Sequence, residues 1–135
     1  MKKLIGAFFL IAIVMATPAC KKNYYPTVNQ AFSAVYTITP NQWSSSDDGR
    51  RIFSSLNVPE LTKDFVGNDG VIVYLSFDNG VTYEAIPEVL DGISYGTFHG
   101  LGFVTVDAHR IDGGRISAPG ANVLAKVVLI YTESL

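Results

Sequence analysis

The amino-acid sequence predicts an all-β protein that folds as an antiparallel two-sheet β-sandwich. Three observations predict this fold class. About seven short segments rich in β-branched and aromatic residues are separated by turn-forming residues. The middle of the chain contains a strong hairpin signal, and beyond the N-terminal segment almost no helical pattern occurs. A small closed β-barrel is the alternative arrangement of the same strands.

The N-terminus has the features of a secretory signal peptide, which we predict at residues 1–19. Two lysines precede a mostly apolar run that is too short to span a bilayer as a helix. Cys20, the only cysteine of the chain, follows Ala19 and lies where a bacterial lipoprotein carries its lipidated cysteine. Residues 20–30 are then a tether, and residues 31–135 are the β-sandwich domain. Ordinary secretion with an incidental cysteine is the alternative.

Further along the chain, β-strands are predicted at 31–39, 51–58, 71–77, 83–86, 93–98, 102–108 and 123–131. The first of these alternates apolar and polar residues with a period of two. The runs 71–77 and 123–131 are apolar on both faces, except at Lys126 in the second run, and such runs are typical of central strands. We therefore expect 71–77 to be covered on both sides. Seven short strands of this kind favour a sandwich that is immunoglobulin-like in general shape.

The segments between the strands contain one candidate helix. Residues 61–66 are predicted to form a single helical turn, capped by Thr62 and closed by Gly67. The polar segment 44–49 and the segment 87–91 are predicted to be connections.

The strongest local signal is a β-hairpin in residues 70–87. An Asn-Gly pair lies between its two β-prone runs and readily takes the positive φ angles of a type I′ turn. With these two residues as the turn, Ser76 pairs with Tyr83 and Tyr74 pairs with Ala85.

The hairpin turn resembles the Asp-box, a short motif of the form Ser-x-Asp-x-Gly-x-Thr-aromatic. In the families that carry this motif, it caps a hairpin and takes no part in catalysis, so the resemblance implies a structural role. The sequence has one copy and no repeat of about 40 residues, which argues against a propeller. The turn residues are Ser76, Asp78, Asn79, Gly80, Thr82 and Tyr83, with Tyr where Trp is commoner.

Several segments together resemble small lipoproteins of Bacteroidetes that have no assigned activity. These segments are the leader with its lipobox-like Ala19-Cys20, the PNQW and LNVPELT segments, the central hairpin and the closing KVVLIY strand. The resemblance implies an anchor of several acyl chains on Cys20, more than the two signals needed for stable membrane attachment. It brings no catalytic residues and no cofactor.

The charge of the chain bears on its partners and its location. After Lys22 the chain has six basic and twelve acidic residues, a net charge of −6, which argues against a nucleic-acid partner. Lys21 and Lys22 suit contact with anionic lipid headgroups. In Bacteroidetes lipoproteins, acidic residues shortly after the cysteine often mark export to the cell surface, and they are missing here. The periplasmic face of the outer membrane is therefore favoured over the cell surface.

Three functional classes follow from these features. The first is a non-enzymatic envelope lipoprotein with an interaction or structural role, whose partner is an envelope protein or a glycan. The alternative is a glycan- or ligand-binding module, which needs aromatic side chains on one face. The third is a serine hydrolase using Ser94, because GISYG matches G-x-S-x-G, although the strand–turn–helix context of that motif is missing. The aromatic candidates are Trp43, which adjoins a polar turn, and Tyr24, Tyr25, Tyr36, Tyr83 and Tyr95. Small β-sandwiches fill their cores with aromatic residues, so core packing is the favoured interpretation for most of these candidates.

The densest group of potential ligands is formed by Asp107, His109 and Asp112. On an extended strand, Asp107 and His109 point to the same side. With His99 nearby, imidazole and carboxylate ligands would suit zinc or manganese. The sequence has no recognised metal-binding spacing and no available cysteine ligand, so a solvated strand end and a polar loop are the favoured interpretation. No metal site is predicted.

Overall fold

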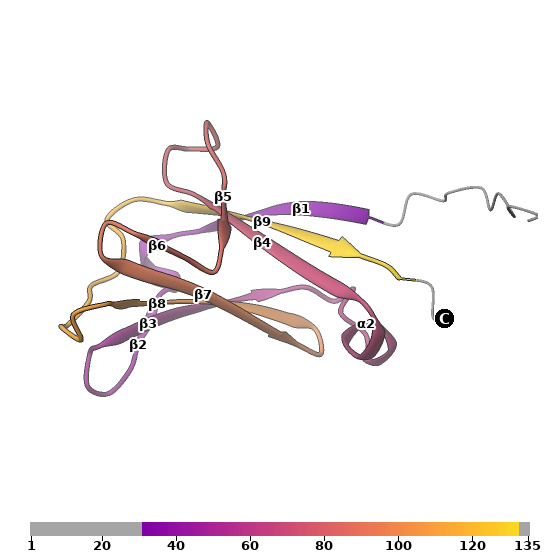
Figure 1. The fold of residues 1–135 in the computed structure, drawn as a ribbon, viewed down its shortest axis with the longest axis horizontal. Coiled ribbons are helices and arrows are strands. Elements are labelled where there is room, and N and C mark those ends of the chain that lie inside the picture. The colour runs from indigo at the N-terminus through magenta and orange to yellow at the C-terminus, as the bar shows by residue number, and fades with distance from the viewer. Residues whose placement is uncertain (1–30, 133–135) are drawn as a thin grey trace, which may run out of the picture.

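The computed structural model describes residues 31–132, which form a sandwich of two antiparallel sheets (Figure 1). One sheet has the order β1-β9-β4-β5 and the other has the order β2-β3-β8-β7-β6. The predicted β-sandwich is confirmed, and the sheets do not close into a barrel. The strands are β1 (Ala31–Ile38), β2 (Ser44–Ser45), β3 (Arg51–Asn57), β4 (Gly70–Ser76), β5 (Glu84–Ile86), β6 (Glu88–Leu90), β7 (Ile93–Gly100), β8 (Phe103–Arg110) and β9 (Val123–Ile130).

The N-terminal predictions lie outside the described residues. They are the signal peptide at 1–19, the lipidated Cys20, the tether at 20–30, and the tyrosines Tyr24 and Tyr25.

All seven predicted strands are present, and their bounds agree with the prediction within two residues. The strands β2 and β6 are additional and lie in segments that were predicted to be connections. They have two and three residues, which is too short to carry an alternating pattern. Each is an edge strand that is defined by its pairing, β2 with β3 and β6 with β7.

Two short helical segments join the sheets. The 3-10 helix η1 (Pro40–Gln42) follows β1, and the helix α2 (Lys63–Asn68) follows β3. Thr62 caps α2 as predicted, since its hydroxyl accepts a hydrogen bond from the Phe65 N–H at 3.3 Å. The prediction that Gly67 closes the helix is wrong. Gly67 lies inside α2, and the helix ends at Asp69, whose backbone is extended and whose N–H donates to the Phe65 carbonyl.

The core lies between the two sheets. Along β9 every second residue is buried, and the residues between them are half-buried on the outer face of the four-stranded sheet. The central strand β8 contributes three side chains of zero exposure to the opposite wall. Residues at and before α2 close one end of the core. The main members of the core are Ile38, Leu61, Phe65, Val73, Leu75, Val104, Val106, Ala108, Val123, Ala125, Val127 and Leu129.

The two strands that are apolar on both faces, β4 and β9, are both central, as predicted. The prediction that β4 is covered on both faces is wrong, because Ile72 on its outer face is 37% exposed. The β4–β5 turn reaches another part of this outer face, where the Tyr83 ring lies against Lys126 of β9. Next to Ile72 along the strand, Tyr74 instead contacts Lys126 of β9, whose Nζ lies 4.7 Å from the ring centroid.

The β4–β5 hairpin has the predicted register, with Tyr74 opposite Ala85. Asn79 and Gly80 have φ angles of 60° and 89°, the positive values that a type I′ turn needs. The ladder ends one pair before Ser76, so the predicted pairing of Ser76 with Tyr83 is wrong.

Candidate functional site

The carboxylate of Asp78 organises the β4–β5 turn. It accepts hydrogen bonds from the Ser76 hydroxyl at 2.7 Å, from the Thr82 N–H at 2.9 and 3.0 Å, and from the Thr82 hydroxyl at 2.6 Å. The Ser76 hydroxyl in turn accepts from the Gly80 N–H at 2.8 Å. The polar groups of the turn are thus hydrogen-bonded to one another, which favours a structural role for this segment.

The hydrogen bonds of the turn predict a loss of stability in acid. The Thr82 hydroxyl, the Thr82 N–H and the Ser76 hydroxyl lower the pKa of Asp78 from 3.8 to about 2. A lowered folded-state pKa stabilises the fold above the unfolded-state pKa, and this contribution is lost as the pH falls through the folded-state pKa. We expect the urea midpoint to decline between about pH 4 and pH 2. The variant Asp78→Asn should show a smaller decline, and an equal decline would contradict this assignment.

Asp107, His109 and Ser94 come together on the outer face of the five-stranded sheet. Ser94 of β7 lies directly opposite His109 of β8, and Asp107 is on the same side of β8 as His109, as predicted. Asp107 is buried and accepts a hydrogen bond from Arg51 Nε at 3.0 Å, while Arg51 Nη2 lies 2.9 Å from the same oxygen. Gly96 makes room for this carboxylate, since a Cβ atom there would lie 3.0 Å from Asp107 Oδ1.

This arrangement does not assemble the parts of a serine hydrolase. Among residues 31–132, no hydrogen bond joins Ser94 to His109, and Asp107 is paired with Arg51 instead of orienting the imidazole. Ser94 lies within β7, so the sharp strand-to-helix turn that G-x-S-x-G requires is missing.

The third predicted ligand, Asp112, is separate from Asp107 and His109. It lies in the turn after β8 and accepts from Arg110 Nε at 2.9 Å and from the Gly114 N–H at 2.9 Å. These contacts lower the pKa of Asp112 to about 2. His99 lies near the other end of β7 and is exposed. In the described part of the chain, no three His, Cys, Asp or Glu side chains are grouped closely enough to hold a metal ion.

The prediction of Trp43 as a surface aromatic is wrong. Trp43 follows η1, where the chain crosses from one sheet to the other, and its side chain is 9% exposed within the core. Its indole Nε1 is buried without a hydrogen-bond partner in the described residues. Tyr95 is buried as well, and Tyr83 contacts Lys126, whose Nζ lies 4.2 Å from its ring centroid. Tyr36 lines a groove beside β1.

Three exposed phenylalanines, Phe53, Phe98 and Phe103, are grouped on one sheet face instead. They lie on the outer face of the five-stranded sheet, on β3, β7 and β8. The rings of Phe98 and Phe103 meet edge to face with centroids 6.5 Å apart. A shallow hollow of about 320 Å³ lies beside Phe53 and Phe98 and is also lined by Ser46 and Arg51. The sequence feature that indicates these three rings is the alternation of residues along their strands, which places them on the face that points away from the core.

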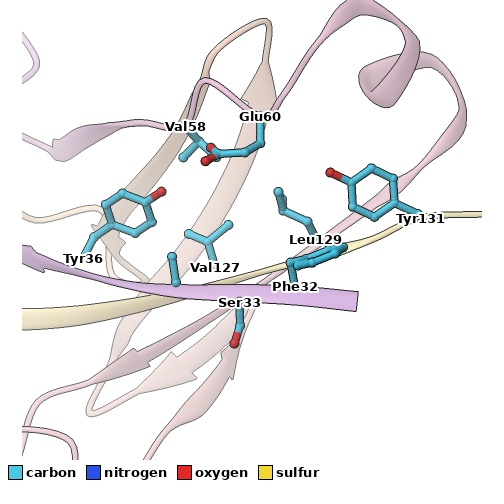
Figure 2. A pocket seen from close by; sticks show the side chains of 9 residues that line it. Phe32, Ser33, Tyr36, Val58, Glu60, Val127, Leu129 and Tyr131 are labelled. Atoms are coloured by element: carbon cyan, nitrogen blue, oxygen red, sulfur yellow. The ribbon is translucent and has the colours of Figure 1, made fainter. Parts of the chain in front are cut away.

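A second hollow, of about 310 Å³, is an apolar groove beside β1 (Figure 2). Val127 and Leu129 of β9 line it next to the aromatic side chains of β1, and Glu60 turns its carboxylate toward the Tyr36 side (Figure 2). Partial burial, and then the charge of Glu60, raise the pKa of Tyr36. The groove is lined by Phe32, Ser33, Ala34, Tyr36, Val58, Glu60, Val127, Leu129 and Tyr131.

Comparisons with known proteins identify no relative. The chain matches no protein-family model, no curated protein and no solved structure. Within residues 31–132, no helix has the length and apolar character needed to cross a membrane.

Proposed function

We propose that the protein is a lipid-anchored lipoprotein of the bacterial outer membrane that acts through binding and not through catalysis. The observation that carries the proposal is the position of Cys20, the only cysteine, directly after a basic and apolar leader. A lipid-modified cysteine at this position supplies more than the two signals that stable membrane attachment needs. The resemblance to small Bacteroidetes lipoproteins supports the same location.

The side-chain contacts of the domain support a binding role. The acidic side chains that the sequence marked as ligands are engaged with neighbouring groups, Asp107 with Arg51 and Asp112 with Arg110. The surface formed by residues 31–132 has a hollow beside β1 and another beside Phe98. The groove beside β1 is close to the first described residue, Ala31, where the proposed tether at residues 20–30 joins the domain.

The anchor is tested by the variant Cys20→Ser expressed in a Bacteroidetes host. We expect this variant to leave the membrane fraction, because without a thiol the chain cannot receive the thioether-linked lipid. The matched control Lys22→Ala alters the adjoining tether but keeps the thiol, and it should remain in the membrane fraction. A Cys20→Ser protein that stays with the membrane would show that the lipoprotein assignment is wrong.

The face of the membrane is tested separately by adding protease to intact cells, with a periplasmic protein as the control. Protection of the protein is expected, since the residues after Cys20 are basic and lack the acidic residues associated with surface export. Digestion would place the domain on the cell surface and overturn the preference for the periplasmic face, while leaving the anchor itself intact.

A second candidate function, glycan binding, is favoured by the hollow beside Phe53 and Phe98. Aromatic rings supply large, rigid contact surfaces, and Ser46 and Arg51 place polar groups at the same hollow. The variant Phe98→Ala should then abolish binding on a glycan array while changing the urea midpoint only slightly. Val89→Ala, exposed on the same sheet face but outside the hollow, is the control. A wild-type protein that binds no glycan on the array excludes this candidate.

A further inference from the structure

Within residues 31–132, one of the four sheet edges lacks the usual protection against pairing with another chain. The edge strands β2, β5 and β6 have two or three residues, whereas the fourth edge strand, β1, has eight. Native proteins protect edges by short strands, charges, prolines or bulges. The sequence of β1, AFSAVYTI, has no charge and no proline, and it pairs with β9 over eight consecutive residues without a bulge.

The accessible part of β1 is centred on Ala34. Residues 31–37 are exposed or half-exposed, whereas Ile38 is fully buried. This accessible run has seven residues, and Ala34 is its centre. Phe32, on one side of this centre, is 60% exposed, although it is on the core-facing side of the sheet next to the buried Leu129.

The groove lies beside the same strand. Phe32 and Tyr36 both contribute to it, on opposite sides of Ala34 along β1 (Figure 2). A strand added to the free edge of β1 would continue the four-stranded sheet, and its core-facing side chains would extend the apolar wall of the groove. The open edge and the groove therefore point to the same occupant, a further β-strand.

We propose that β1 pairs antiparallel with β1 of a second copy of this chain, around a two-fold axis that passes through Ala34. This register uses all seven accessible residues and places the small side chain of Ala34 next to its own copy. It places Phe32 of each copy opposite Tyr36 of the other, and aromatic cross-strand pairs are stabilising. Because β1 carries no charge, self-pairing brings no like charges into opposition.

The resulting dimer has a continuous eight-stranded sheet with the order β5-β4-β9-β1-β1-β9-β4-β5. A two-fold axis perpendicular to the sheet keeps the core-facing side of both copies on one face, as an isologous interface requires. The proposal does not rest on the proposed anchor. It is compatible with it, because the two Ala31 residues would lie about 20 Å apart along the paired strands, and eleven extended tether residues reach about 36 Å.

The experiment uses the chain from Lys21 onward, which retains every described residue and contains no cysteine. Size-exclusion chromatography with light scattering should give twice the monomer mass. The variant Ala34→Lys puts two ammonium groups at the axis and should raise the dimer dissociation constant at least tenfold. Ile72→Lys, on the outer face of β4 and away from the edge, is the matched control and should leave the dimer intact.

Single cysteines test the register of the dimer. With a short bis-maleimide crosslinker, Ala34→Cys should crosslink to itself, because directly opposed Cβ atoms are only about 5 Å apart. Ala31→Cys and Thr37→Cys should crosslink only when the two variants are mixed. Efficient self-crosslinking of Val35→Cys without that of Ala34→Cys would overturn the axis.

Other outcomes overturn the dimer itself. A monomeric mass at the highest soluble concentration would do so, and so would a dimer that Ala34→Lys leaves unchanged. A monomer that dimerises only after removal of residues 21–30 would assign the edge of β1 to the tether of the same chain, against the proposal. Circular dichroism of each variant establishes that a lost dimer is not a lost fold.

Discussion

Replacing Trp43 with alanine is expected to lower the free energy of unfolding by about 3–5 kcal/mol. Trp43 is 9% exposed and belongs to the core, so its removal leaves a large cavity at the point where η1 leads into β2. Domains of this size are stable by about 5–15 kcal/mol in total, so the loss is a large part of the stability. Urea unfolding followed by circular dichroism measures this free energy. Tryptophan fluorescence cannot be used, because the variant lacks the only tryptophan of the chain.

Two controls separate the loss of packing from the loss of a surface contact. The conservative variant Trp43→Phe should be far less destabilising, because it keeps an aromatic ring and gives up an indole N–H that has no partner in the described residues. Phe98→Ala removes a ring that is 50% exposed, and it should change the free energy of unfolding by about 1 kcal/mol or less. If Trp43→Ala unfolds at the same urea concentration as the wild type, the burial of Trp43 in the core is wrong.

The parts of the fold that the sequence predicts are those whose signal is local. The Asn-Gly turn and the long apolar runs identify β4 and β9 as central strands. Thr62 identifies the start of α2, because its hydroxyl accepts a hydrogen bond from Phe65, only three residues further along the chain. The strands β2 and β6 are not predictable in this way, because two or three residues become a strand only through their neighbours. Gly67 was misassigned for a related reason. The helix ends through the extended backbone of Asp69, with no need for a glycine in the left-handed conformation.

The candidate sites depend on contacts between distant parts of the chain, which the sequence does not show. The carboxylate of Asp107 is neutralised by Arg51, 56 positions earlier, and this pairing removes it from the predicted ligand group. Trp43 has polar neighbours in the sequence, yet the crossing between the sheets turns its ring into the core. The groove combines β1, β9 and the segment after β3, so no single stretch of sequence indicates it.

A comparison of Leu75→Ala with Ile72→Ala tests which face of β4 is buried. The two residues lie on opposite faces of the same strand, Leu75 at 1% exposure and Ile72 at 37%. Leu75→Ala is expected to cost about 2–5 kcal/mol through lost burial and the cavity left behind. For a domain of this size, each kcal/mol lowers the melting temperature by roughly 4–8 °C.

Ile72→Ala should cost only about 1 kcal/mol, because much of its side chain is already in water. Calorimetry of the two variants therefore measures the difference between a core face and an open face on one strand. If Ile72→Ala costs as much as Leu75→Ala, the outer face of the four-stranded sheet is covered in solution. The cover would then have to come from outside residues 31–132, since within that range Ile72 is 37% exposed.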